Sequence, residues 1–87
     1  METTDAEKAL AYYRAAVEDR RPAYVPSRIR LQRRVCGDGP FRSTLAEPGV
    51  HACISNQWGA VSVTAANGGM LGVKPAEFDV VEWRDND

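Results

Sequence analysis

Apolar residues recur at intervals of three and four between positions 5 and 20, and this periodicity predicts an amphipathic helix. Thr4 and Glu7 have the spacing of a capping box, in which each side chain binds a free backbone N–H at the start of the helix. Pro22 cannot continue a helix, so we expect the helix to end before it. The apolar stripe of this helix comprises Ala6, Ala9, Leu10, Tyr13, Ala16 and Val17.

Alternation of apolar and polar residues predicts a β-unit that spans residues 28–83. In its first predicted strand, residues 28–35, the apolar side chains of Ile29, Leu31 and Val35 point to one face. Arg28, Arg30, Gln32 and Arg34 point to the other face, whereas Arg33 falls on the apolar side and should lie near the strand end or snorkel. We therefore expect one apolar face and one face that carries three arginines.

Prolines, glycines and polar clusters separate the predicted strands. Residues 22–27 form an extended connector that contains two prolines, and it marks no domain boundary. The other predicted elements are a turn at 36–40, a short strand at 41–45, a turn at 47–49, a strand from 50 to 55, a turn at 56–57, a strand at 58–65, a return strand at 70–73, a helical turn at 75–78 and a last strand at 80–83. Asn67 and Gly68 have the sequence of a tight hairpin turn, in which both central positions favour positive φ.

These elements predict a single α+β domain over residues 1–87, with a helix at 5–20, the β-unit at 28–83 and a polar tail at 84–87. A helical turn directly before the final strand is typical of SH3-like barrels. The segment GAVSV followed by GVKPAEFDVVEW resembles that pattern. The resemblance implies a helix packed on a small antiparallel five- or six-stranded SH3-like barrel or bent sheet.

Composition places the chain among ordinary globular domains, with 44% apolar and 26% charged residues. The formal net charge of −1 hides an uneven distribution. Residues 14–42 contain eight arginines against three acids, a net charge of +5, whereas residues 74–87 contain two bases against five acids, a net charge of −3. The acidic end could imitate nucleic-acid phosphates, or its charges could simply be solvated.

The sequence shows no membrane or export signal. Its first ten residues carry acids where a signal peptide carries bases, and no apolar run approaches the roughly 18 residues that span a bilayer. We therefore expect a cytoplasmic protein with no membrane partner.

His51 and Cys53 are the only residues that suggest metal or covalent chemistry. They lie on the same face of a predicted strand, where they could act as two metal ligands or as a base and its nucleophile. A tetrahedral metal site needs further ligands, and Cys36 or Asp38 could supply them only if their turn folds back. We favour a structural role, with Cys53 in the core and His51 at the surface, and hence no enzyme, cofactor or metal.

The arginines of the first strand are the strongest candidates for binding. Arginine binds carboxylates and phosphates through a planar fork of donors, and exposed tryptophan often anchors interfaces. The slightly negative net charge counts against a dedicated nucleic-acid domain. A solvated strand face and a protein-binding patch are the other interpretations. The predicted binding residues are Arg28, Arg30, Arg34, Arg42 and Trp58.

The block N-x-W-G-A-V-S-V followed by L-G-V-K-P-A-E-F-D-V-V resembles short accessory proteins of phages and prophages. Small phage proteins of this kind often bind and inhibit a host machine, as anti-CRISPR proteins do. The resemblance implies a non-enzymatic inhibitor that covers a surface of a host protein or ribonucleoprotein complex. The alternative is a nucleic-acid-binding accessory or regulatory module that uses the arginine-rich strand.

Overall fold

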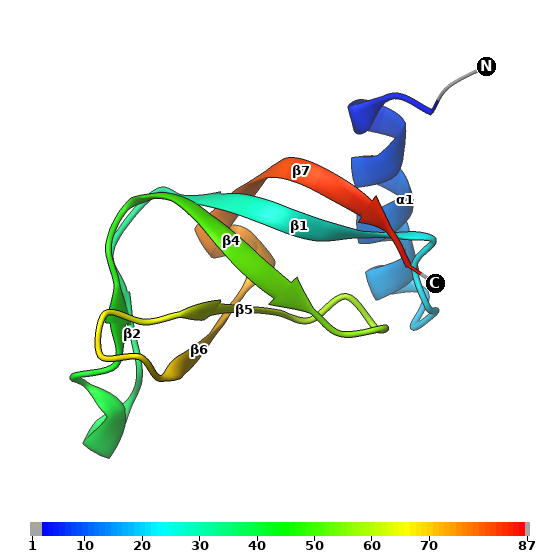
Figure 1. The fold of residues 1–87 in the computed structure, drawn as a ribbon. Helices are drawn as coiled ribbons and strands as arrows, with labels where there is room; N and C mark the ends of the chain where they lie inside the picture. The colour runs from blue at the N-terminus through cyan, green and yellow to red at the C-terminus, as the bar shows by residue number, and fades with distance from the viewer. Residues whose placement is uncertain (1–2, 87) are drawn as a thin grey trace.

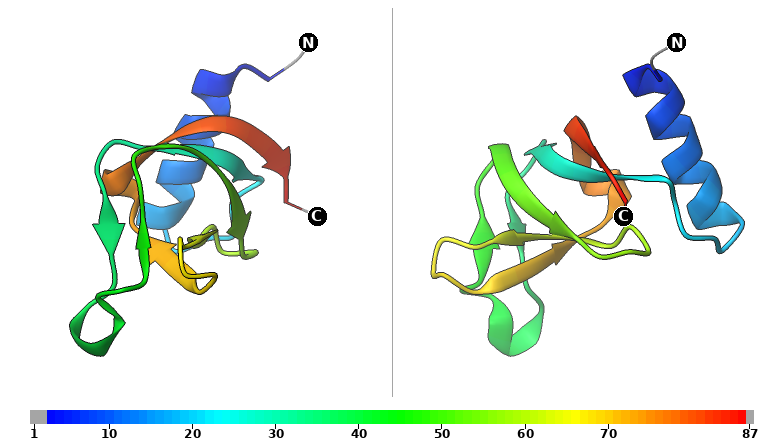
Figure 2. Two further views of the ribbon diagram at one scale, coloured as in Figure 1. Left: turned by 60° about the vertical axis from the view of Figure 1, so that its left-hand side comes forward. Right: turned by 45° about the vertical axis from the view of Figure 1, so that its right-hand side comes forward.

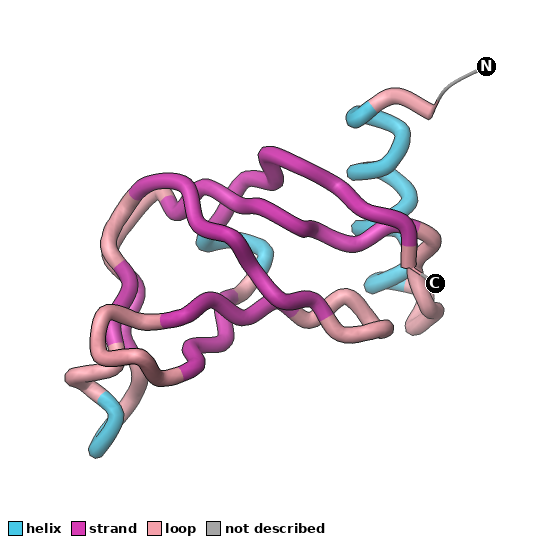
Figure 3. The backbone as a smooth tube through the Cα atoms, viewed as in Figure 1, coloured by secondary structure: helices cyan, strands magenta, loops and turns pink. Residues whose placement is uncertain are grey.

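One helix precedes seven strands and two short 3-10 helices in the computed structural model, which describes residues 3–86 (Figure 1). In chain order the elements are α1 (Asp5–Val17), β1 (Tyr24–Leu31), β2 (Val35–Cys36), η1 (Gly39–Phe41), β3 (Leu45–Ala46), β4 (Gly49–Ser55), β5 (Val61–Thr64), β6 (Met70–Val73), η2 (Pro75–Glu77) and β7 (Phe78–Asp85). Figure 3 shows how strands dominate the chain after the helix. The predicted α+β class is confirmed.

Five strands form one antiparallel sheet in the order β6-β5-β4-β1-β7, and β2 pairs separately with β3. Figure 2 shows that the sheet is strongly bent, because β4 crosses between a layer of β1 and β7 and a layer of β5 and β6. Within the described residues, β6 and β7 remain the two edges of the sheet and do not pair. The bent-sheet alternative is therefore confirmed, and the closed barrel is wrong.

The helix begins with the predicted capping box, in which the Glu7 N–H donates to Thr4 Oγ1 at 3.2 Å. It ends at Val17, three residues earlier than predicted. Asp19 adopts a left-handed conformation with φ of 54°, and the Arg20 N–H donates to the Ala15 carbonyl at 2.8 Å. These features form a Schellman-type cap, which ends the helix before Pro22 can.

The core lies inside the bend of the sheet and is built from alternate residues of the strands. Its buried members are Ile29, Leu31, Val35, Ala46, Val61, Val63, Ala65, Leu71, Val73 and Phe78. A second buried contact holds the helix against β1 and β7, and the buried residues of the helix are Tyr12 and Ala15. The predicted apolar stripe of the helix instead lies largely towards solvent, since Leu10, Tyr13 and Val17 are exposed.

Strand β1 begins at Tyr24, inside the segment predicted to be a connector, and it ends at Leu31 rather than at residue 35. Pairing with β7 explains the earlier start, because Val25 lies opposite Arg84 and Pro26 lies opposite Trp83. The register shifts after Pro26, as expected where a proline cannot donate to the ladder.

Two other predicted strands differ from the structure. The strand predicted at 41–45 is wrong, because η1 and a turn occupy most of this range before the short strand β3. The strand predicted at 58–65 begins only at Val61, since residues 57–58 continue the preceding turn. The return strand at 70–73 and the helical turn after Lys74 are confirmed.

The hairpin between β5 and β6 is confirmed, although only Gly68 has positive φ, of 85°. The Asn67 side chain instead stabilises the turn by accepting a hydrogen bond from the Gly69 N–H at 3.0 Å. The predicted polar tail is largely ordered, because Arg84 and Asp85 belong to β7. Asp87 lies outside the described residues, and over residues 3–86 no helix has the length and apolar character needed to cross a bilayer.

Candidate functional site

Arg28 and Arg30 project from β1 away from the core, because Ile29 and Leu31 point into it. Strand β1 lies between β4 and β7, so both arginines stand on a hydrogen-bonded ladder with neighbours on either side. Among residues 3–86 neither guanidinium has a hydrogen bond or an ion pair. Both therefore have their donors available for an external carboxylate or carbonyl.

A row of aliphatic side chains lies beside the arginines on β4. Arg28 pairs across the sheet with Ala52, and Arg30 pairs with Val50. Val50 is 48% exposed, and Ile54, two residues beyond Ala52, is 63% exposed. The five residues Arg28, Arg30, Val50, Ala52 and Ile54 form the outer face of the sheet.

Two acids border the outer face on its other side, along β7. Asp79 lies opposite Arg30 and Glu82 lies opposite Arg28. Asp79 accepts a hydrogen bond from the Gln32 side chain at 2.9 Å, and Glu82 accepts one from Ser27 at 3.0 Å. Two bases and two acids therefore balance each other here, so Arg28 and Arg30 do not make this part of the sheet basic.

Strand β4 can present an aliphatic row because its polar residues point inwards. Ser55 is buried and its hydroxyl donates to the Pro26 carbonyl at 2.6 Å. Cys53 packs against the core, as predicted, and its thiol donates to the same carbonyl at 3.5 Å. His51 is half-buried rather than on the surface, with Nε2 2.7 Å from the Glu47 carbonyl.

These contacts disfavour chemistry at His51 and Cys53. Burial raises the pKa of Cys53, so its thiol stays protonated at neutral pH and is a weak nucleophile. Within residues 3–86 no group of three or more potential ligands gathers as a metal site would require. Both cysteines there are free, and Cys36 is exposed.

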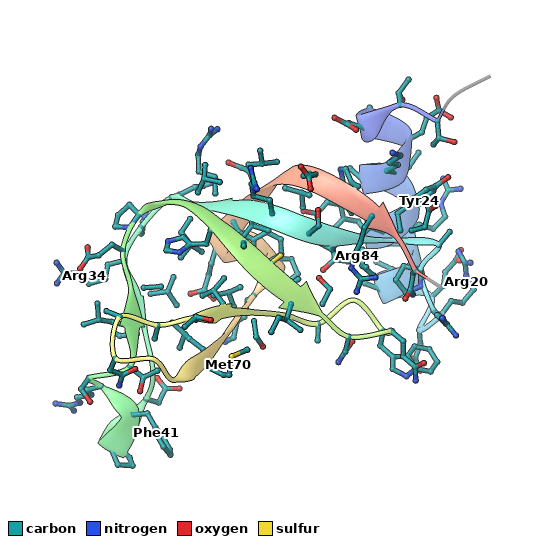
Figure 4. All side chains as sticks on the ribbon, in the orientation of Figure 1. Arg20, Tyr24, Arg34, Phe41, Met70 and Arg84 are labelled. Atoms are coloured by element: carbon teal, nitrogen blue, oxygen red, sulfur yellow. The ribbon has the colours of Figure 1, made fainter. Side chains whose placement is uncertain are left out.

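The other predicted binding residues lie away from the outer face. Arg34 follows β1 and its Nε lies 3.2 Å from a carboxylate oxygen of Glu47, in an exposed ion pair. Figure 4 shows Arg34 at the end of the molecule opposite Arg20. Arg42 directly follows η1, in the loop that projects beyond this end of the sheet in Figure 1. Of the predicted set, the structure brings only Arg28 and Arg30 together.

Trp58 belongs to the turn between β4 and β5, and this turn lies at the helix end of the molecule, away from the η1 loop (Figure 1). Its backbone N–H donates to the Asn56 side chain at 2.8 Å. The indole is exposed and lines a hollow of about 290 Å³ together with Tyr12, Ala16 and Pro75. Trp58 is therefore an exposed aromatic residue, but it belongs to the helix end of the molecule.

A second hollow, of about 490 Å³, lies between the η1 loop and the β5–β6 hairpin. Exposed Phe41 and Met70 line it, and Figure 4 shows both at the same end of the molecule. Sequence reasoning missed both residues as surface apolar groups. Phe41 was predicted to lie in a strand, and no local pattern indicates that η1 replaces it.

Sequence reasoning also left the aliphatic row of β4 unassigned. The alternation of apolar and polar residues was visible, but an alternating strand has two faces and the pattern does not say which one is buried. In comparisons with known proteins, no family model, no curated protein sequence and no solved structure matched the chain. The function of the outer face must therefore be inferred from its own residues.

Proposed function

We propose that the protein binds another protein through the outer face of its bent sheet. The observation that supports this proposal is the row of exposed aliphatic side chains beside two arginines that have no partner among residues 3–86. Covering apolar side chains such as Val50 and Ile54 removes them from water, which is favourable, and arginine is among the residues that contribute most to protein interfaces. A partner surface with an apolar centre and a carboxylate would complement this face.

The geometry favours a protein over a nucleic acid as the partner. Single-stranded nucleic acid binds to basic grooves in which aromatic side chains stack on the bases. The residues next to Arg28 and Arg30 on β4 are aliphatic, and the facing acids Asp79 and Glu82 cancel their charge. The exposed aromatic residue of the predicted set, Trp58, instead lines a hollow beside the helix.

The central position of β1 and β4 suits a mechanism in which the face covers a partner surface. Strand β1 has a neighbour on each side, and β4 pairs with β1 over residues 49–52 and with β5 over residues 53–55. Little backbone entropy is therefore lost when a partner binds. Inhibition of a host defence complex by an anti-CRISPR-like phage protein would use this kind of occlusion. The phage origin, this inhibition and the SH3-like relationship all stay predictions from the resemblance.

The proposal is tested by affinity purification of tagged protein from its native cells. We expect a specific protein partner to be retained by the wild type and to be lost with the double variant Arg28→Gln, Arg30→Gln. The matched control is Arg33→Gln, Arg42→Gln, because it removes the same charge from two exposed arginines outside the outer face. Equal retention by both variants, or a wild type that retains no partner, contradicts the proposal.

Nucleic-acid binding is the alternative, and nuclease treatment and an oligonucleotide binding assay distinguish it. Under that alternative, nuclease treatment would release the retained material, and a labelled oligonucleotide would bind with an affinity that falls steeply as salt rises. We expect retention to resist nuclease and the oligonucleotide not to shift at low salt.

A further inference from the structure

The helix uses one side for docking and leaves another apolar side uncovered. Tyr12 and Ala15 are buried against the sheet. The residues Ala6, Leu10, Tyr13 and Val17 are all exposed, and they are separated by four, three and four positions. This spacing is that of the seam in a coiled coil, where apolar residues repeat every 3.5 positions on average.

The helix cannot rotate so as to bury the seam against its own sheet, because Tyr12 fixes the rotation of the helix. Its hydroxyl donates to the Gly59 carbonyl at 2.6 Å, and its ring packs edge-on against Trp83 at 5.4 Å. Rotating Leu10 and Val17 towards the sheet would break both contacts. Val17 is 87% exposed, so the sheet does not cover this end of the seam.

We propose that α1 pairs with α1 of a second copy of the chain in an antiparallel arrangement. In that register the Leu10 of one copy lies against the Tyr13 of the other, and Ala6 lies against Val17. Two-fold symmetry produces each of these two contacts a second time, so each residue of the seam meets an apolar residue of the other copy. This inference is independent of the proposed function, since it uses a different element of the molecule.

Charge complementarity supports the antiparallel orientation. Glu7 and Arg14 flank the same side of the seam, seven positions apart. In the antiparallel register, Glu7 of one copy and Arg14 of the second copy lie side by side, between the Ala6–Val17 contact and the Leu10–Tyr13 contact. Two-fold symmetry produces this ion pair twice. Among residues 3–86 Arg14 has no ion-pair partner within its own chain. A parallel pair would place Arg14 beside Ala9 and leave Glu7 without a basic neighbour.

The other side of the seam carries small residues. Ala9 and Ala16 flank it, and in the antiparallel register Ala9 of one copy lies opposite Ala16 of the second copy. Small side chains let two helices approach closely along this side. Trp58 lies beside Ala16 and would extend the contact beyond the helix.

The size of the surface predicts a weak dimer. A helix of 13 residues is about 20 Å long, and a pair of such helices buries less than the roughly 1,200 Å² of a stable interface. We therefore expect association that depends on concentration between about 10 μM and about 1 mM, the range of weak protein complexes. A reductant must be present, because exposed Cys36 could form an intermolecular disulfide.

Sedimentation velocity over this concentration range tests the proposal. We expect the wild type to shift from monomer to dimer, and Leu10→Glu to weaken association at least about tenfold, because the charge would enter the seam twice. Met70→Glu is the matched control, since Met70 is 55% exposed against 58% for Leu10 and lies away from the helix. A wild type that stays monomeric, or a Leu10→Glu variant that associates like the control, overturns the proposal.

Charge reversal tests the orientation. Glu7→Arg and Arg14→Glu each place like charges opposite one another, so each variant alone should associate more weakly than the wild type. Because Glu7→Arg also removes the acceptor of the Thr4 N–H, the mixture of the two variants decides the test. An equimolar mixture of the two should form a heterodimer, because both ion pairs are then restored. Circular dichroism checks that each variant keeps its helix. If one variant loses its helix, the comparison of Leu10→Glu with Met70→Glu decides the proposal instead. Folded variants that fail to associate on mixing would overturn the antiparallel register.

Discussion

Tyr12 joins the helix to the sheet through a contact that depends on the residue facing it. Gly59 has a φ of 88°, and a Cβ built there would lie 2.8 Å from a ring carbon of Tyr12. Only glycine therefore allows both the turn and the close approach of the ring. The 2.6 Å hydrogen bond from the phenol to the Gly59 carbonyl follows from this close approach.

Burial raises the pKa of Tyr12 from 10.0 to about 12, with smaller contributions from Tyr13 and Cys53. Because the folded-state pKa lies above the unfolded value, the fold favours the neutral phenol. This contribution to stability is complete below pH 10 and is lost as the pH rises through 12. We expect Tyr12→Phe to cost about 1 kcal/mol at neutral pH through the lost hydrogen bond. The difference from wild type in urea-denaturation free energy should then shrink between pH 10 and pH 12, and a constant difference would contradict this account of the phenol.

Asp19 carries a conformational cost that glycine would remove. It holds the left-handed position of the helix cap with φ of 54°, and its carboxylate lies near the negative end of the helix dipole. We expect Asp19→Gly to raise the free energy of unfolding by about 0.5–1 kcal/mol, after allowing for the greater entropy of the unfolded chain. Thermal or urea unfolding measures the change. A loss of stability would show that the carboxylate has a role that the cap geometry does not reveal.

At the scale of the elements, the orientation of β4 decides what the outer face presents. Ser55 and Cys53 point inwards and share the Pro26 carbonyl, which places the aliphatic residues of the strand outside. A one-residue change of register would exchange the two sets completely. The aliphatic row therefore depends on these two polar contacts at β1.

The same substitution at two valines tests this orientation. Val50 lies on the outer face at 48% exposure, whereas Val63 is buried on the neighbouring strand β5. We expect Val50→Thr to change the free energy of unfolding by less than about 0.5 kcal/mol. Val63→Thr should cost about 1–3 kcal/mol, because its hydroxyl would be buried without a partner. Denaturant titration compares the two variants. If Val50→Thr lowered the free energy of unfolding as much as Val63→Thr does, Val50 would be buried and β4 would present its other residues to solvent.

Local signals made most elements predictable from the sequence. The capping box of Thr4 and Glu7, the strand at 70–73 and the helical turn that begins at Pro75 each rest on a few neighbouring residues, and the structure confirms them. Long-range pairing decided the rest. Strand β1 begins four residues earlier than predicted because it pairs with β7, more than fifty residues later in the chain.

The candidate site was only half predictable for the same reason. Arg28 and Arg30 could be identified because their own strand alternates with buried Ile29 and Leu31. The aliphatic row beside them comes from another strand, and its burial depends on contacts that the local pattern does not contain. The docking side of the helix was likewise set by one tyrosine and its distant glycine rather than by the apolar stripe.

At the scale of the whole molecule, the two proposed surfaces lie on different elements of an elongated body that measures 45 × 24 × 21 Å. The outer face belongs to β1 and β4, and the seam belongs to α1. Their functions should therefore be separable. We expect Leu10→Glu to weaken self-association while retaining the partner, and Arg28→Gln with Arg30→Gln to lose the partner while retaining self-association.

Sedimentation and affinity purification of the same two proteins check this separation, with Met70→Glu as the control for both. Loss of partner retention in the Leu10→Glu protein would mean that dimerisation is required for binding. Loss of self-association in the arginine variant would mean that the outer face belongs to the dimer interface. Either result would contradict two independent surfaces.

The central claim is that the outer face of the sheet contacts the partner. Chemical modification of arginine in the purified complex, located by mass spectrometry, measures this contact directly, whatever the partner is. We predict that Arg28 and Arg30 react more slowly in the complex than in the free protein, while Arg33 and Arg42 react equally in both. Unchanged reactivity of Arg28 and Arg30, with protection of Arg33 or Arg42 instead, would contradict the account.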